Sequence, residues 1–181
     1  MSNTIRRPSP LLRELVKASQ MAQQSAFARS LKEFGLTNLV IPYWGIATVT
    51  VGREFYQPDE GGKLAVIVPA FEHGRIVDLV ACSFETSQVR TRKGIASVLG
   101  HEWIDDAKLG LEPLKVFDDV FSWLRGRCRG VVVLDFDAAP RLLRDVPSLH
   151  CESPAMAQVL TETFGWPQPD PPITDSKGAR R

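Results

Sequence analysis

The sequence lacks most of the short patterns that mark the commonest enzyme classes. It contains no glycine-rich phosphate-binding loop, no Gly-x-Ser-x-Gly nucleophile turn and no Cys-x-x-Cys pair. Its three cysteines, at positions 82, 128 and 151, are odd in number and far apart, so a disulfide framework is not expected. We therefore expect reduced thiols and a cytoplasmic protein.

Long hydrophobic runs are also missing. The longest uninterrupted run, residues 64–71, is far shorter than the roughly 18–20 apolar residues that a membrane-crossing helix needs. No long apolar stretch follows the basic pair Arg6 and Arg7, so a secretory signal is not expected either. Neither a membrane span nor a membrane partner is predicted.

A large excess of charge of one sign is lacking as well. The 22 Lys and Arg residues stand against 21 Asp and Glu, and the net charge of +1 gives no overall field that would attract nucleic acid. Residues 1–37 carry six basic and two acidic side chains, whereas residues 38–123 carry eight basic and twelve acidic ones. This pattern favours docking of the N-terminal segment within the chain, or on a second copy, over a nucleic-acid-binding arm.

What the chain does contain is the composition of an ordinary globular protein. Of its 181 residues, 44% are hydrophobic and 24% are charged, and this length corresponds to one domain. We expect a flexible N-terminus at residues 1–10 and a single α+β domain at residues 11–165. Residues 166–181 are rich in proline and have little to bury, so a flexible tail is expected there.

The first half of the chain predicts one helix followed by antiparallel strands. Residues 11–34 repeat apolar side chains at helical spacing, which indicates a long helix, bent near residues 19–24, with Leu12, Leu15 and Val16 in its buried stripe. The hairpin turn is expected at His73 and Gly74. β-branched and alternating residues predict a meander of strands at 39–41, 45–51, 64–69, 75–83 and 87–92.

The C-terminal third alternates between helical and strand patterns. Pro113 suits the start of a helix whose apolar face runs from Val116 to Leu124, and Ser153 suits the cap of the last helix. We expect this alternation to pack on the same sheet as the central meander, which gives an α+β fold. Residues 94–111 are ambiguous, and the segments 94–99 and 102–108 are each compatible with a helical turn or two. Helices are expected at 140–144 and 154–164, and strands at 131–136 and 148–151.

Asp135 and Asp137 are the candidate metal ligands. Residues i and i+2 of a strand point to the same side, so both carboxylates can converge on one cation, and such oxygen ligands suit Mg²⁺. The simpler interpretation is structural, because acidic side chains before a helix are stabilised by its dipole. No cofactor is predicted, and Mg²⁺ is the alternative that this pair leaves open.

Two basic segments are candidates for binding phosphate or nucleic acid. If they meet in the fold, their six cations surround two glycine-bearing turns and form a cradle for an anion. Cations at 125–129 also have a structural explanation, since they follow a predicted helix and complement its dipole. The residues are Arg90, Arg92 and Lys93 in the first segment, and Arg125, Arg127 and Arg129 in the second.

Histidine and cysteine offer two further patterns, both of which have simpler structural interpretations. His101 begins a short acidic stretch that superficially resembles a zinc-protease helix, but Asp105 stands where the second histidine would be. Cys151 lies before a predicted helix start, which can activate a thiol. Its neighbour His150 would point to the opposite face of an extended strand, so we interpret Cys151 as inert. His73 is interpreted as a solvated turn residue.

The leading hypothesis is a binding or accessory protein without catalytic activity. It would act by protein–protein contact, first by self-association, through an apolar helix face or the arginine-rich turn. The alternative is a phosphate- or nucleic-acid-binding protein, extending to a metal-dependent phosphate-processing enzyme that uses Asp135 and Asp137 for the cation and residues 125–129 for the anion. Sequence alone does not identify the ligand, the partner or the biological process.

Overall fold

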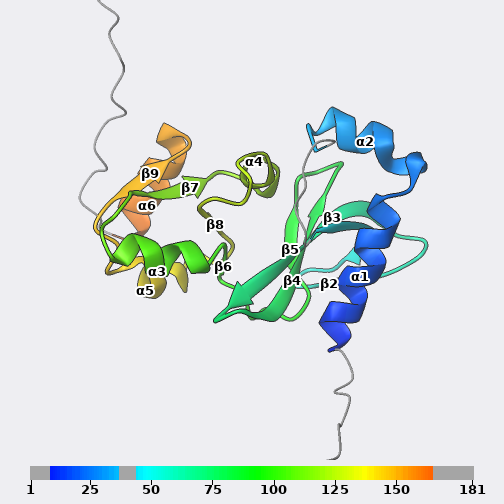
Figure 1. Ribbon diagram of the computed structural model, residues 1–181, viewed down its shortest axis with the longest axis horizontal. Coiled ribbons are helices and arrows are strands. Elements are labelled where there is room, and N and C mark those ends of the chain that lie inside the picture. Colours follow the sequence, from blue (N-terminus) through cyan, green and yellow to red (C-terminus); the bar gives the residue numbers. More distant parts are fainter. Residues whose placement is uncertain (1–8, 37–43, 165–181) are drawn as a thin grey trace, which may run out of the picture.

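The computed structural model describes residues 9–36 and 44–164. Helices and strands both contribute strongly, which confirms the α+β class. Figure 1 shows two sheets that lie next to each other, each with its own helices. The first sheet is antiparallel and has the order β2-β1-β3-β4-β5, formed by β1 (Gly45–Val51), β2 (Tyr56–Pro58), β3 (Lys63–Glu72), β4 (Arg75–Ser83) and β5 (Val89–Thr91).

The C-terminal strands form a second sheet, whereas we expected them to pack on the first. Its order is β6-β8-β7-β9, made by β6 (Val98–Leu99), β7 (Leu114–Phe117), β8 (Val131–Val133) and β9 (Leu149–Cys151). β7 pairs in parallel with both β8 and β9, while β6 is antiparallel to β8. Strands separated by helices pair most readily with one another in parallel, and they therefore do not continue the antiparallel meander.

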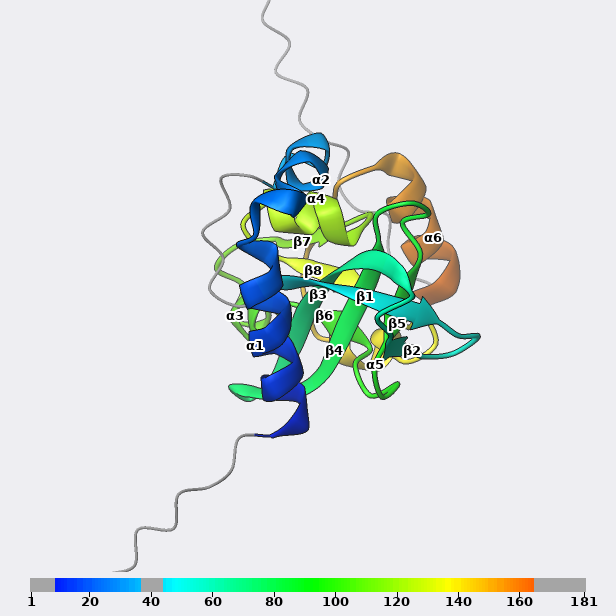
Figure 2. The ribbon, with the colours of Figure 1, turned by 90° about the vertical axis from the view of Figure 1, so that its right-hand side faces the viewer.

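The apolar run at residues 64–71 is explained by the position of β3, which is covered on both faces. Ala65 and Ile67 pack in one cluster with α1 (Pro10–Ala22), and Val66 and Val68 pack in another with side chains of the second sheet. Figure 2 shows α1 running across the strands of the first sheet. A strand that is buried on both faces needs apolar residues at every position, which is why this run does not alternate.

The second sheet is also covered on both faces. Leu99 and Val132 face the cluster shared with the first sheet, which includes Phe121 of α4 (Val120–Arg125). On the opposite face, Val131 and Val133 belong to a cluster completed by α3 (Glu102–Lys108), α5 (Ala139–Leu143) and α6 (Pro154–Phe164). The alternation along β8 thus joins two cores through one short strand.

The N-terminal helix is interrupted where the bend was expected. α1 ends at Ala22, Gln24 is extended with ψ of 137°, and a short 3₁₀ turn (Ser25–Phe27) leads into α2 (Ala28–Glu33). The buried stripe of α1 is Leu11, Leu15 and Ala18. Leu12 and Val16, which we placed in that stripe, are 38% and 47% exposed, because the helix turns the residues at 11, 15 and 18 towards the sheet instead.

The helix predicted from Pro113 is wrong. Residues 114–117 form β7, in which Leu114 and Val116 are buried and Lys115 is exposed, so the true period is two. The helix α4 begins only after Asp119, whose carboxylate accepts the N–H of Ser122 at 2.8 Å as an N-cap. Three apolar residues, Leu114, Val116 and Phe117, are too few to decide between the two periods, and pairing with the neighbouring strands decides instead.

Most other expected elements are present. His73 and Gly74 both have positive φ, as the tight hairpin turn between β3 and β4 requires. Ser153 Oγ accepts the N–H of Met156 at 3.1 Å and caps α6 as predicted. The helical turn considered for 94–99 does not form, since Val98 and Leu99 form β6. The strand expected at 39–41 lies outside the described residues.

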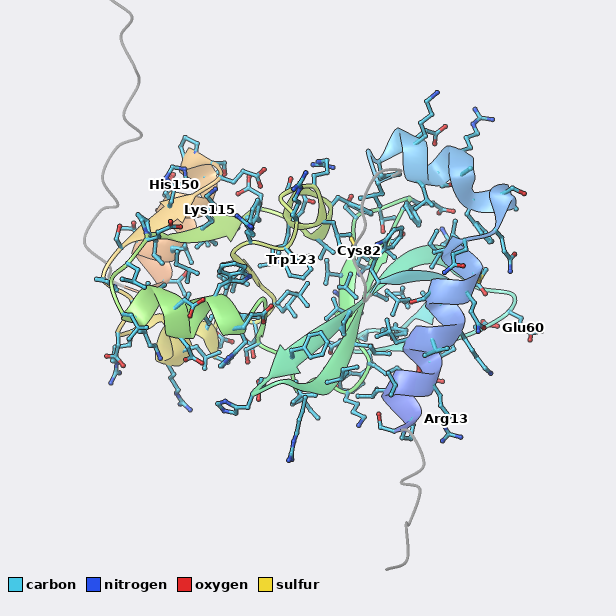
Figure 3. All side chains as sticks on the ribbon, viewed as in Figure 1. Arg13, Glu60, Cys82, Lys115, Trp123 and His150 are labelled. Carbon is cyan, nitrogen blue, oxygen red and sulfur yellow. The ribbon has the colours of Figure 1, made fainter. Side chains whose placement is uncertain are left out.

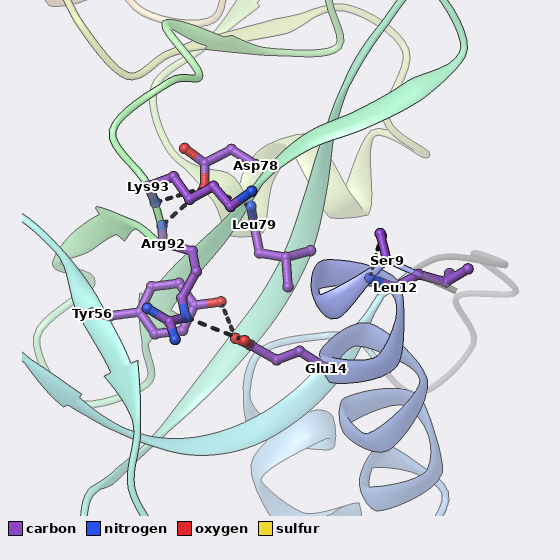
Figure 4. A network of polar contacts seen from close by, with 8 residues as sticks. All are labelled: Ser9, Leu12, Glu14, Tyr56, Asp78, Leu79, Arg92 and Lys93. Carbon is purple, nitrogen blue, oxygen red and sulfur yellow. Dashed lines mark hydrogen bonds and ion pairs between the residues drawn. The ribbon is translucent and has the colours of Figure 1, made fainter. Parts of the chain in front are cut away.

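The carboxylate of Asp78, on β4, is completely buried and is bonded by backbone N–H groups on all sides. Its Oδ1 accepts from Leu79 (2.8 Å), Arg92 (3.1 Å) and Lys93 (2.9 Å). Its Oδ2 accepts from Ile95 (2.8 Å) and Ala96 (3.3 Å). Figure 4 shows Asp78 beside Leu79, Arg92 and Lys93. One side chain therefore fixes the segment that leaves β5 for the second sheet.

A second polar contact joins α1 to the same region. Glu14 accepts the hydroxyl hydrogen of Tyr56 at 2.7 Å and forms an ion pair with Arg92 at 3.2 Å (Figure 4). The Arg92 guanidinium also lies 5.9 Å from the centre of the Tyr56 ring. Burial, reinforced by the Glu14 carboxylate, raises the pKa of the Tyr56 hydroxyl far above its ordinary value, so it remains a donor.

Replacement of Asp78 should destabilise the protein strongly. Asp78→Ala leaves several buried N–H groups without an acceptor and should lower the free energy of unfolding by about 3 kcal/mol or more. Asp78→Asn keeps one carbonyl oxygen and should cost less than alanine. Urea unfolding measures both, with Asp137→Ala, at an exposed site, expected to stay within about 0.5 kcal/mol of the parent. An alanine variant as stable as this control would contradict the structure.

Two glycines with the same backbone conformation should respond differently to alanine. Gly100 and Gly110 have φ of 75° and 72°. A Cβ atom at Gly100 would collide with the carbonyl oxygen of Gly130, whereas a Cβ atom at Gly110 would meet no other atom within 4 Å. Gly110→Ala should cost about 1 kcal/mol for its positive φ alone. Gly100→Ala should cost at least about twice as much, since a backbone clash is added. Equal losses in thermal or urea unfolding would show that the contact is loose.

Candidate functional site

Asp135 and Asp137 are exposed and follow β8, as expected. Asp135 Oδ1 accepts the backbone N–H groups of Asp137 (2.9 Å) and Ala138 (3.2 Å), so it closes the turn that leads into α5. Within residues 9–36 and 44–164, no three His, Cys, Asp or Glu side chains are grouped as a metal site would require. The hydrogen bonds of Asp135 fit the interpretation in which this residue stabilises the start of a helix. The Mg²⁺ site stays a prediction that the geometry does not support.

The first basic segment is used inside the fold. Arg90 donates to the carbonyl oxygens of Arg53 (3.1 Å) and Val89 (2.7 Å), and Arg92 is paired with Glu14. The backbone N–H of Lys93 is bound by Asp78, and the residue as a whole is exposed to solvent. These contacts direct two of the three cations towards the first sheet and α1.

The second basic segment lies elsewhere. Arg125 donates to the carbonyl oxygen of Phe34 (3.3 Å) and to Ser122 Oγ (2.9 Å), whereas Arg127 and Arg129 are exposed. Figure 2 shows α4, which Arg125 ends, well away from β5. The structure therefore does not bring the six cations together around one anion.

A nucleic-acid site would also use aromatic rings for base stacking, and the two tryptophans Trp123 and Trp103 have different surroundings. Trp123 is buried between the sheets (Figure 3), and its indole N–H donates to the carbonyl oxygen of Gly130 at 2.8 Å. Trp103, on α3, is only half-buried. A stacking platform needs an exposed ring face, and Trp123 does not offer one.

The histidines of the acidic stretch and of the hairpin turn meet. His101 precedes α3, and its ring centroid lies 5.9 Å from that of His73, with an angle of 68° between the ring planes. Our interpretation of His73 as a merely solvated residue missed this contact. The sequence carries no signal for it, because the two residues come from different sheets and approach only after both sheets have packed together.

The thiols are not activated. Burial, with a further contribution from the Asp118 carboxylate, raises the pKa of Cys151, which is the opposite of what a nucleophilic thiol needs. Burial also raises the pKa of Cys82 and of Cys128 to about 12. Figure 3 shows Cys82 between the two sheets. This agrees with the interpretation of Cys151 as an inert side chain.

The clearest candidate site is a groove of about 400 Å³ on the second sheet. One wall is α3, with Trp103 near its start and Ala107 near its end, and the other is the start of β7 with Gly130 beside it. A Cβ at Gly130 would approach the carbonyl oxygen of Lys115 to 2.5 Å, so only glycine lets the chain form this wall. The remaining lining residues are Asp106, Leu111, Glu112, Pro113, Leu114, Lys115 and Arg129.

Two large apolar side chains just after α3 are exposed, and one of them, Leu111, lines the groove. Leu109 is 72% exposed and Leu111 is 77% exposed, more than the other large hydrophobic residues that are exposed in the described part of the chain. Gly110, between them, has φ of 72° and donates its N–H to Ala107 at 2.9 Å, which ends α3 and turns the chain towards β7. The turn thus presents both leucines to solvent. We call Leu109, Leu111 and the groove the α3–β7 surface.

This surface was missed because residues 94–111 gave mixed patterns. The signal that was available is Leu109-Gly110-Leu111 itself, in which a helix-ending glycine sits between two leucines that no helical or strand period buries. Comparison of the chain with protein-family models, curated proteins and solved structures finds no match. In the described ranges, no helix has both the length and the apolar character that crossing a membrane demands.

Stability should fall at alkaline pH through the buried thiols. A thiol with a folded pKa of about 12 and an ordinary value of 9.0 stabilises the fold fully below pH 9, and this contribution is lost as the pH rises from 9 to about 12. Cys82→Ala should therefore lose less unfolding free energy over this interval than the parent does. Urea unfolding across the interval measures the difference. Parallel curves for the two proteins would contradict the burial of the Cys82 thiol.

Proposed function

We propose that the chain is a protein-binding module that holds an apolar side chain of a partner protein at the α3–β7 surface. The observation that carries this proposal is the exposure of Leu109 and Leu111 beside a groove large enough for such a side chain. Scattered exposed leucines are ordinary, but two that are separated by a single residue, one of them lining a groove, are typical of an interaction site.

The composition of the groove supports the same proposal. Trp103, Leu111 and Pro113 offer apolar contact. The lining also includes two basic residues, Lys115 and Arg129, and two acidic residues, Asp106 and Glu112. An apolar centre with a charged rim of both signs is the usual anatomy of a protein–protein interface. Such a rim fits a partner segment with one apolar anchor between polar residues.

A second copy of the chain is one partner that fits this description. The surface carries both a projecting element, the leucine pair, and a receiving one, the groove. A two-fold dimer needs one patch that is complementary to itself, and this arrangement meets that need. Phosphate chemistry has less support, because Asp135 closes a turn and the two basic segments lie apart.

Site-specific photo-crosslinking tests the proposal. A photoreactive residue in place of Leu111, in cells that normally make the protein, should give one discrete adduct. The same residue in place of Val16, an exposed apolar position on α1, should not. The adduct should be lost when Leu109→Asp is added, because that substitution puts a charge beside the apolar centre.

The mass of the adduct identifies the partner: twice that of the chain means a second copy. Leu109→Asp should leave the thermal unfolding midpoint nearly unchanged, since the side chain is exposed. An adduct at position 111 no stronger than at position 16, or one that survives Leu109→Asp, would overturn the proposal.

A further inference from the structure

The contact between His73 and His101 has a chemical consequence that is independent of the α3–β7 surface. His73 lies at the tip of the β3–β4 hairpin of the first sheet, and His101 lies between β6 and α3 of the second. Their ring centroids are 5.9 Å apart. The chain contains three histidines in all, so two of the three meet at this junction.

The backbone of each histidine is held in place by regular structure. His73 has φ of 49° in a two-residue turn that is closed by pairing of Glu72 with Arg75. His101 stands immediately before α3, and its carbonyl oxygen accepts the N–H of Ile104 at 3.0 Å. The two rings thus project from defined backbone positions, one in the hairpin turn of the first sheet and one between β6 and α3, and both remain accessible to solvent, since His73 is exposed and His101 is half-buried.

The ring separation suits a shared transition-metal ion. Imidazole nitrogens bind Zn²⁺ at about 2.0–2.1 Å, which places each ring centroid roughly 3.2 Å from the ion and two such centroids roughly 5–6.4 Å apart. The observed 5.9 Å falls inside this interval. Rings on one ion need not be coplanar, so the angle of 68° between their planes is compatible with this arrangement.

We propose that His73 and His101 together bind one divalent transition-metal ion of the Zn²⁺, Ni²⁺ or Cu²⁺ class. Imidazole suits these ions, whereas Mg²⁺ and Ca²⁺ prefer oxygen. No three-residue metal cluster occurs in residues 9–36 and 44–164, so water completes the coordination. The ion joins the hairpin of the first sheet to the helix start of the second.

Metal titration of the chelator-treated full chain tests this, with Ni²⁺ alone as the probe. The parent should bind one equivalent in calorimetry and unfold at a higher temperature with the ion present, because a ligand that binds the folded state stabilises it. His73→Ala and His101→Ala should each weaken binding by about tenfold or more, since one of two protein ligands is lost. His150→Ala, at the exposed third histidine on β9, should bind like the parent.

Proton NMR gives an independent readout. Paramagnetic Ni²⁺ should broaden the ring signals of His73 and His101 before those of His150. Equal broadening of all three histidines, or unchanged affinity in both His73→Ala and His101→Ala, would overturn the proposal and leave adventitious surface binding only. Both substituted positions are accessible to solvent, so the variants should keep the parent fold, which their amide spectra check.

Discussion

The buried carboxylate of Asp78 is the interaction on which the arrangement of the two sheets depends. A charge removed from water is tolerated only when hydrogen bonds replace its hydration, and Asp78 obtains five from backbone N–H groups. Four of the five come from residues 92–96, the segment that links β5 to the second sheet. Without this carboxylate, the backbone of residues 92–96 would lose the hydrogen bonds that fix its course between the sheets.

The same segment is tied a second time, by the ion pair of Arg92 with Glu14 on α1. The pair is only partly buried, so its own contribution to stability is small next to that of Asp78. The pair mainly positions Arg92, because Asp78 binds the backbone N–H of this residue and Glu14 binds its guanidinium group. Helix, first sheet and linking segment consequently meet at one residue.

The sequence was sufficient for much of the fold because local signals agreed with the tertiary structure in those places. Gly74 marked the hairpin turn and Ser153 marked the start of α6, since each satisfies a backbone requirement that does not depend on distant residues. The segment after Pro113 misled us because Val116 and Phe117 stand at helical spacing from Val120 and Phe121, although only the later pair is helical. Only pairing with β8 and β9, which lie later in the chain, decides for the strand.

The candidate sites were harder to predict for a related reason. Single residues such as Asp135 and Arg92 were recognised by type, but their roles depend on neighbours that only the fold supplies, namely the turn before α5 and Glu14. The contact of His73 with His101 is of the same kind, because it spans two sheets. Residue type along the sequence thus suggests what a side chain can do, while packing determines whether it has a partner.

The exposure of Leu109 and Leu111 is difficult to explain by folding alone. Apolar side chains that stay in water add little to stability, since the hydrophobic gain depends on the area removed from solvent. The turn itself needs only Gly110, whose positive φ ends α3, and any polar residue would serve on either side of it. The backbone around the leucines is nevertheless restrained, by the hydrogen bond from the Gly110 N–H to Ala107 and by Pro113, which precedes β7. A restrained turn that exposes two apolar side chains, one of them in the lining of a groove, suits partner binding, because less conformational freedom is then lost on association.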